Sequence, residues 1–136
     1  MPKFGKRSRD RLKGVHPKLV NVLNDLVKIY DVTILEGVRS KERQLELYEK
    51  GRTKVKDSKH MHGLAVDVCP FPVDWSDIKR FFYMAGIVMT LAKKHRVNIR
   101  WGGDWNQDGK FHGKKSSKAS DPRQTFNDYP HFELKL

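Results

Sequence analysis

Two short segments of the chain bring together residues that could bind a metal ion. The first places His60 on a loop and Asp67 on the predicted strand that follows it. A loop–strand passage of this length can fold back so that both side chains face one point. Aspartate is disfavoured in the middle of a strand unless it has a specific partner. The structural alternative is an Asp67 satisfied by a nearby arginine or by backbone amides.

The second segment lies near the end of the chain. His131 and Glu133 are two residues apart on a predicted strand and therefore project from one face. Asp128 is expected to precede this strand, in a turn that contains Pro130. Two histidines and one carboxylate would leave zinc an open position for water, as in catalytic zinc sites. A second carboxylate outside the ligand set could then take a proton from that water, and Asp128 is the candidate.

The cysteine and the remaining histidines favour structural interpretations. Structural zinc prefers four ligands rich in cysteine, whereas this chain contains a single cysteine, Cys69. His16 lies at the start of one predicted helix and His95 near the end of another, where a partly positive imidazole is favourable. His62 lies close to His60 in sequence but is not assigned as a ligand.

A third segment resembles half of a calcium site. Asp104-x-Asn106-x-Asp108-Gly109 matches the first half of an EF-hand loop. The twelfth position of that loop would be Lys115, where a bidentate glutamate is needed. A polar surface turn is the default interpretation, and a Ca²⁺ ion bound by Asp104, Asn106 and Asp108 is the alternative.

Hydrophobic patterning predicts the elements that position these residues. Ser40 and Asp74 are suitable N-caps for two of the helices. The pattern predicts an α+β fold in a single domain over 1–136, with about three helices on a small, mostly antiparallel sheet. Residues 1–15 form a basic N-terminal segment and 102–128 a long surface loop. The helices are expected over about 17–30, 41–50 and 75–95, and the strands over about 32–38, 64–69, 97–101 and 131–134.

Charge and hydropathy restrict the partners. The chain has 28 lysines and arginines against 16 aspartates and glutamates, a net charge of +12. Such a charge favours anionic partners, among them nucleic acid, anionic lipid and the polymers of a bacterial wall. No segment approaches the roughly 18 apolar residues that span a bilayer. The basic N-terminus is not followed by the apolar run of a secretory signal.

Several motifs, in order along nearly the whole chain, carry a resemblance to a known family. The paired signature is Ser58-x-His60-x-x-Gly63-x-Ala65-x-Asp67 with Asp128-x-x-His131. Three further segments are Phe4-Gly-Lys-x-Ser8 with Leu12-x-x-Val15-His16-Pro17, Gly37-Val-Arg39-Ser40 with Gln44, and Trp101-Gly-Gly-Asp-Trp105. Together they resemble the zinc D-alanyl-D-alanine carboxypeptidases and L-alanyl-D-glutamate endopeptidases, and most of all the tailed-phage endolysins of that family.

The resemblance implies roles for individual residues. It implies one Zn²⁺ per chain held by His60, Asp67 and His131, with Asp128 as the general base. It implies Arg39 as the cation that steadies the oxyanion or the substrate carbonyl, whereas the structural alternative is a salt bridge from Arg39 to Glu36 or Glu42. Supporting or substrate-binding roles are expected for Ser58, Gln44 and Glu133.

The resemblance also implies a function. The expected protein is a monomeric phage endolysin that cuts peptidoglycan stem peptides, most of all at the L-alanyl-D-glutamate bond. It would wait in the host cytoplasm until lysis and then act on the wall. One alternative is a D-alanyl-D-alanine carboxypeptidase or dipeptidase with the same site. Others are a basic nucleic-acid-binding protein or nuclease, although no recognised nucleic-acid motif is present, and a catalytically inactive wall-binding module.

Overall fold

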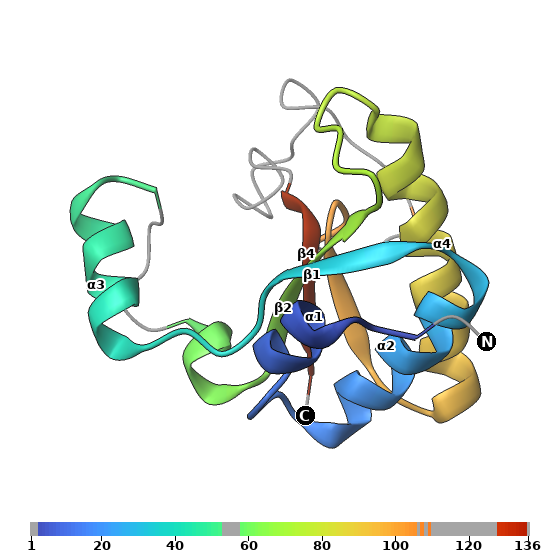
Figure 1. Cartoon of the computed structure of the whole chain (residues 1–136), viewed down its shortest axis with the longest axis horizontal. Coiled ribbons are helices and arrows are strands. Elements are labelled where there is room, and N and C mark those ends of the chain that lie inside the picture. Colours follow the sequence, from blue (N-terminus) through green and yellow to red (C-terminus); the bar gives the residue numbers. More distant parts are fainter. Residues whose placement is uncertain (1–2, 53–57, 106, 108, 110–127, 136) are drawn as a thin grey trace.

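The computed structural model describes residues 3–52, 58–105, 107, 109 and 128–135. The described elements combine helices with one sheet, so that the expected α+β class is confirmed (Figure 1). In chain order they are α1 (Lys6–Arg11), α2 (Pro17–Ile29), β1 (Val32–Glu36), α3 (Lys41–Glu49), the 3₁₀ helix η1 (Lys59–His62), β2 (Ala65–Pro70), α4 (Ile78–His95), β3 (Ile99–Gly102) and β4 (Asp128–Leu134).

The four strands form one sheet in the order β1-β2-β4-β3, and each neighbouring pair is antiparallel. The register of the central pair places Val66 opposite Phe132 and Asp67 opposite His131. Directly opposed residues of an antiparallel pair share a face, and successive residues alternate between faces. The pairing of β2 with β4 therefore sends Val66 and Phe132 to one face and Asp67 and His131 to the other.

The hydrophobic core lies on the face that carries Val66 and Phe132. Both side chains have no solvent exposure, and they cluster with Phe81, Met84 and Val88 of α4. Helix α4 packs across β2, β3 and β4, and α2 packs on α4. This layer of two helices leaves the other face of the sheet free to carry polar side chains.

The N-terminal segment contains a helix that the sequence pattern did not predict. Helix α1 begins after Gly5 and packs on β1. Its buried Ser8 accepts a hydrogen bond from the backbone N–H of Ile34 at 3.1 Å. Charged residues dominate α1, so that hydrophobic periodicity gives no signal for a helix of six residues.

Several predicted boundaries differ from the structure, and two of them have a clear consequence for the elements concerned. Helix α4 begins at Ile78, because Asp74 accepts hydrogen bonds from the N–H and hydroxyl of Ser76 and forms a turn before the helix. Strand β4 begins at Asp128, which belongs to the strand itself and not to a preceding turn. The helix after Ser40 was correctly predicted, since the Ser40 hydroxyl accepts from the N–H of Arg43 at 3.0 Å.

The position of α3 and the extent of the described residues complete the description of the fold. Helix α3 stands to one side of the sheet (Figure 1), whereas α2 and α4 form the layer against it. Most of the predicted 102–128 loop lies outside the described residues. Within the described part of the chain, no helix is long and apolar enough to cross a membrane.

Candidate metal centre and active site

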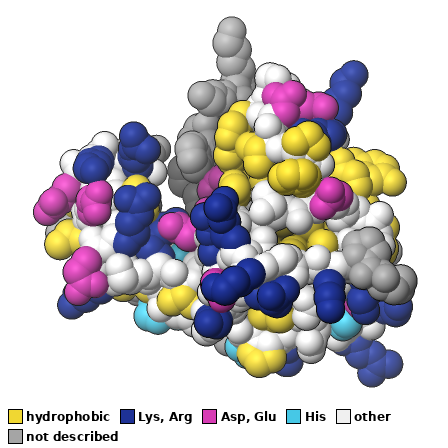
Figure 2. Space-filling view, in the orientation of Figure 1, with side chains coloured by type: hydrophobic (Ala, Val, Ile, Leu, Met, Phe, Trp, Pro, Cys, Tyr) yellow, Lys and Arg dark blue, Asp and Glu magenta, His cyan; other side chains and the backbone are white. Residues whose placement is uncertain are grey.

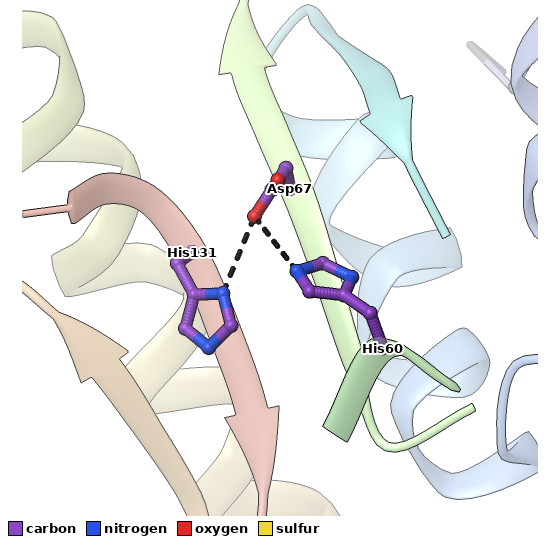
Figure 3. Close-up of side chains that lie close together, drawn as sticks. All are labelled: His60, Asp67 and His131. Carbon is purple, nitrogen blue, oxygen red and sulfur yellow. Dashed lines mark hydrogen bonds and ion pairs between the residues drawn. The ribbon is translucent and has the colours of Figure 1, made fainter. Parts of the chain in front are cut away.

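Three predicted ligands converge on one point beside the sheet (Figure 3). Asp67 projects from β2 and His131 from β4, where the strand register places them side by side, and His60 reaches them from η1. One carboxylate oxygen, Oδ1 of Asp67, lies 3.3 Å from Nε2 of His60 and 3.3 Å from Nδ1 of His131. The structure thus brings together residues that are separated by more than 60 positions in the chain.

His60 is held by the backbone on both sides of its 3₁₀ turn. Ser58 caps η1, and its hydroxyl accepts a hydrogen bond from the N–H of His60 at 3.2 Å. The turn ends at Gly63 with φ of 71°, where a Cβ would lie 2.3 Å from the carbonyl oxygen of Gly14. Only glycine fits this left-handed and crowded position. These contacts explain Ser58 and Gly63 of the motif as residues that shape the turn.

The ring of His60 is oriented by a backbone carbonyl. Its Nδ1 lies 3.0 Å from the carbonyl oxygen of Gly37. A carbonyl oxygen only accepts hydrogen bonds, so Nδ1 carries the proton and donates. Nε2 of His60, which faces Asp67, is then the nitrogen available to a metal ion.

His131 is oriented by a carboxylate. Its Nε2 lies 2.9 Å from Oε1 of Glu133, two residues along the same strand. Nδ1 of His131 is therefore the nitrogen that faces Asp67. His60 and His131 are 2% and 7% exposed, so both rings are buried with one nitrogen of each directed at the same point.

The donor set fits a tetrahedral metal ion. Zinc bonds of about 2.0–2.1 Å place neighbouring tetrahedral ligands roughly 3.3–3.4 Å apart. The two 3.3 Å separations at Asp67 match this spacing, and the three ligand atoms all lie within 4.8 Å of one another. Two imidazoles and one carboxylate leave one position open, as in catalytic zinc sites.

Asp67 and His131 shift each other's pKa in opposite directions. Burial opposes the ionisation of Asp67, but hydrogen bonds from His131 and His60 outweigh it and lower the pKa of this carboxyl. Burial also disfavours a charged His131, whereas its hydrogen bonds to Asp67 and Glu133 raise its pKa to about 9. Without a metal ion, protonated His131 thus provides positive charge beside Asp67.

Asp128 lies at the start of β4, three residues before His131. It pairs with Gly102 at the end of β3, where the register shifts. A Cβ on Gly102 would lie 2.0 Å from the carbonyl oxygen of Asp128, so that the two backbones touch at this position. The close approach is possible because Gly102 has no side chain.

The environment of Asp128 suits proton transfer. Burial and the nearby charge of Asp67 raise the pKa of Asp128 to about 6, while the positive charges of His131, His60 and Arg39 oppose this rise. A carboxyl group that titrates near neutral pH can both accept and return a proton. This shift also shows that Asp128 lies within electrostatic reach of the three predicted ligands and of Arg39.

Arg39 is fixed by two partners. Its guanidinium forms an ion pair with Glu36 and donates from Nη1 to Oε1 of Gln44 at 2.8 Å. The structural alternative, a salt bridge to Glu36, is therefore present. It does not remove Arg39 from the site, because the charge of Arg39 still acts on Asp128. Gln44 is completely buried, which makes it a rigid support for Arg39.

Sequence reasoning missed two residues near His131. Arg100 of β3 donates to Oε2 of Glu133 at 2.6 Å, and Lys59 lies 3.3 Å from the same oxygen. The one available signal was the alternation of Ile99, Arg100 and Trp101, which places Arg100 on the polar face of its strand. No pattern within the sequence joins Arg100 or Lys59 to Glu133.

The possible calcium ligands are only partly described. Asn106 and Asp108 lie outside the described residues. Asp104 lies in a turn, where its Oδ2 accepts a hydrogen bond from the N–H of Gly109 at 3.0 Å. This contact is compatible with the polar turn that was the default interpretation.

Comparisons with known proteins agree on one family. Residues 1–135 match the family described as phage L-alanyl-D-glutamate peptidase. The chain is 32% identical over 118 residues to the L-alanyl-D-glutamate peptidase of Escherichia phage T5, with 81% of this chain and 86% of the phage protein covered. It is also 32% identical over 121 residues to the peptidoglycan L-alanyl-D-glutamate endopeptidase CwlK of Bacillus subtilis, covering 76% of this chain and 60% of CwlK.

The fold is shared with a solved structure. The crystal structure of the Serratia marcescens L-Ala D-Glu endopeptidase ChiX has a TM-score of 0.77 and 30% sequence identity to this chain. The similarity covers 98% of this chain and 90% of ChiX. The resemblance inferred from the motifs thus extends to the whole described fold.

Proposed function

Because this chain belongs to the phage L-alanyl-D-glutamate peptidase family, we propose that it is a zinc-dependent peptidase that hydrolyses the L-alanyl-D-glutamate bond of peptidoglycan. The observation that carries the proposal is the convergence of His60, Asp67 and His131 at tetrahedral spacing. The similarity to two peptidases and to ChiX supplies the substrate class.

The ligand roles follow from the orientation of each side chain. His60 would bind zinc through Nε2, His131 through Nδ1 and Asp67 through its carboxylate. When bound, zinc supplies a Lewis acid that polarises the scissile carbonyl and lowers the pKa of a water molecule. Zinc suits this donor set better than Ca²⁺, which takes six to eight oxygen ligands.

Two further residues carry the chemistry of the chain itself. Asp128 takes a proton from the attacking water and returns it to the leaving amine, and burial, which raises its pKa, favours the return of the proton. Arg39 stabilises the negative charge that develops on the carbonyl oxygen, and Glu36 and Gln44 keep its guanidinium in place.

The proposal also covers the oligomeric state of the protein and the place where it acts. The protein acts on bacterial peptidoglycan as a monomeric endolysin, remaining in the host cytoplasm until lysis gives it access to the wall. The similarity to a phage peptidase supports this interpretation. The net charge of +12 also supports it, since a basic protein is attracted to an anionic wall.

Digestion of purified peptidoglycan tests the proposal. Zinc-loaded wild type should create new N-terminal D-glutamate, identified by mass spectrometry of the released peptides. Asp128→Asn should retain zinc but lose about 10²-fold or more in kcat, because it lacks the base. His131→Ala should lose the metal. Asp25→Asn, which lies in α2 and outside the site, is the control that should behave as wild type.

Two other results would change the proposal. Release of D-alanine instead of new D-glutamate termini would place the protein among the D-alanyl-D-alanine carboxypeptidases with the same site. Absence of any cleavage by wild type with bound zinc would show that the metal site is correct and the substrate class is wrong.

A further inference from the structure

We propose that Glu133 is a positioning residue that fixes which nitrogen of His131 faces the metal, and that Arg100 and Lys59 hold Glu133 for this purpose. The inference rests on the proposed function in one respect, because it assumes that a metal ion binds His60, Asp67 and His131. It gives the supporting role expected for Glu133 a specific form and adds Arg100 and Lys59, to which neither the motifs nor the comparisons assign a role.

The two histidines of the site are oriented in different ways. His60 donates from Nδ1 to the backbone carbonyl of Gly37 and presents Nε2. His131 has the reverse arrangement, with Nε2 against Glu133 and Nδ1 presented. A metal ligand keeps its lone pair only if the proton lies on the other ring nitrogen. The hydrogen bond to Glu133 therefore selects Nδ1 of His131 as the ligand atom.

Glu133 can serve this purpose because it is itself immobilised. It is 5% exposed and lies opposite Arg100 in the pairing of β4 with β3. Its Oε2 is 2.6 Å from Nη2 of Arg100 and 3.3 Å from Nζ of Lys59, which leaves Oε1 for His131. Lys59 also donates to the carbonyl oxygen of Leu134 at 2.9 Å. One carboxylate oxygen is thus anchored by cations while the other orients the imidazole.

An aromatic contact limits rotation of the same imidazole. The ring of Trp105 packs against the ring of His131, with 5.3 Å between centroids. Arg100 lies over Trp105, with its Cζ 5.4 Å from the ring centroid. Arg100 therefore contacts two of the residues that contact His131, namely Glu133 and Trp105. A guanidinium can combine an ion pair with stacking in this way, which an ammonium group does less well.

A purely structural role for Glu133 makes different predictions. An ion pair between Arg100 and Glu133 that served only to join β3 and β4 would not depend on Oε1 or on the state of His131. In that case, loss of Glu133 would lower the free energy of unfolding without a selective effect on metal affinity. A positioning role requires the opposite pattern: weaker zinc binding in a protein that remains folded.

The first measurement is zinc affinity by competition with a chromophoric chelator. Glu133→Ala should bind zinc about 10–100-fold more weakly than wild type, as is usual when the hydrogen-bond partner of a ligand histidine is lost. Glu133→Gln, which keeps the size and one acceptor oxygen, should show a smaller loss. Circular dichroism of the metal-free proteins shows whether each variant is folded.

The matched control is a second histidine–carboxylate pair away from the metal site. Nε2 of His95 in α4 lies 2.6 Å from Oδ2 of Asp25 in α2. Asp25→Asn removes a carboxylate from this pair, as Glu133→Gln does at His131. It should leave the zinc affinity unchanged. An equal loss in both variants would overturn the proposal, because the effect would then be one of general stability.

The second measurement does not depend on any Glu133 variant being folded. Long-range ¹H–¹⁵N spectra of zinc-loaded wild type report which imidazole nitrogen carries the proton. His131 should show a protonated Nε2 and a metal-bound Nδ1, and His60 the reverse. Zinc on Nε2 of His131, or wild-type affinity in both Glu133 variants, would overturn the inference. Failure of wild type to bind zinc at all would instead contradict the proposed function.

Discussion

At the scale of residues, the site is a cluster of buried polar groups that satisfy one another. Asp67 accepts from two imidazoles, and each imidazole is oriented by a further acceptor, Gly37 or Glu133. An unpaired buried carboxylate would cost several kcal/mol, so that such a group is retained only with partners. The raised pKa of His131 and the lowered pKa of Asp67 are two consequences of the same contacts.

Proton release on zinc binding follows from the pKa of His131. In the metal-free protein this pKa is about 9, so that His131 is protonated at pH 7, whereas zinc binds only the unprotonated nitrogen. We therefore expect about one proton to be released per zinc at pH 7. The apparent zinc affinity should rise about tenfold per pH unit up to roughly pH 9 and then level off. Titration calorimetry in buffers of different ionisation enthalpy measures both quantities, and a pH-independent affinity would contradict the prediction.

The raised pKa of His131 also affects the stability of the metal-free protein, which should fall as the pH rises, whereas the zinc affinity should increase. The folded-state pKa of His131 is raised from its usual 6.5 to about 9, so protonated His131 stabilises the fold fully below about pH 6.5. This stabilisation is lost as the pH rises through 9. Zinc should therefore raise the thermal midpoint by more at pH 9 than at pH 6.

At the scale of elements, the antiparallel pairing of β2 with β4 assembles the site. Asp67 and His131 are neighbours only because they are directly opposed in this register. A shift of one residue would send one of them to the core face, since side chains alternate along a strand. Val66 and Phe132, which are completely buried against α4, prevent such a shift. The hydrophobic core therefore fixes the relative position of Asp67 and His131, the two proposed ligands on the sheet.

The contact between β3 and β4 provides a test of how Asp128 is placed. A methyl group at Gly102 would lie 2.0 Å from the carbonyl oxygen of Asp128, and backbone atoms cannot yield as a flexible side chain can. We expect Gly102→Ala to displace Asp128 and to lower kcat by about 10–100-fold, since a misplacement of about 1 Å can have that effect. Zinc affinity should change little, and comparing kcat with the zinc dissociation constant separates the two effects.

A second glycine serves as the control. Gly86 lies within α4, and no atom lies within 4 Å of the position that its Cβ would occupy. Gly86→Ala should leave kcat unchanged and stabilise the helix by up to about 1 kcal/mol. Wild-type activity of Gly102→Ala would show that the position of Asp128 does not depend on this contact.

At the scale of the whole molecule, charge is the dominant property. Figure 2 shows lysine and arginine side chains distributed over the visible face, including the region of α1, with acidic side chains interspersed. The chain has 28 basic and 16 acidic residues, and the net charge of +12 creates a positive field around the molecule. Such a field attracts a polyanionic surface and raises the rate of encounter with it.

Salt dependence tests this electrostatic attraction. Raising the ionic strength from about 0.1 M to about 1 M shortens the Debye length from roughly 10 Å to roughly 3 Å. We expect digestion of intact peptidoglycan to slow several-fold over this range, while hydrolysis of a short neutral stem peptide changes little. Equal sensitivity of the two substrates would indicate that salt acts on the active site, and equal insensitivity would show that the net charge is not used.

The sequence by itself determined the class of the fold, the elements near the site and the ligand types. Periodic hydrophobic residues predict α2 and most of α4, because helix burial depends on local spacing. The motifs around His60 and His131 predicted the residues of the candidate metal site, and the structure brings His60, Asp67 and His131 together. These properties are encoded within short segments and can be read without the rest of the chain.

The tertiary structure alone decided how those residues are used. It placed Asp128 within β4, set which nitrogen of each histidine faces Asp67 and brought Arg100 and Lys59 to Glu133. Each of these features depends on strand register or on contacts between residues far apart in sequence. Local propensity does not specify a register, because the packing of the core against α4 selects it only once β2 and β4 have paired.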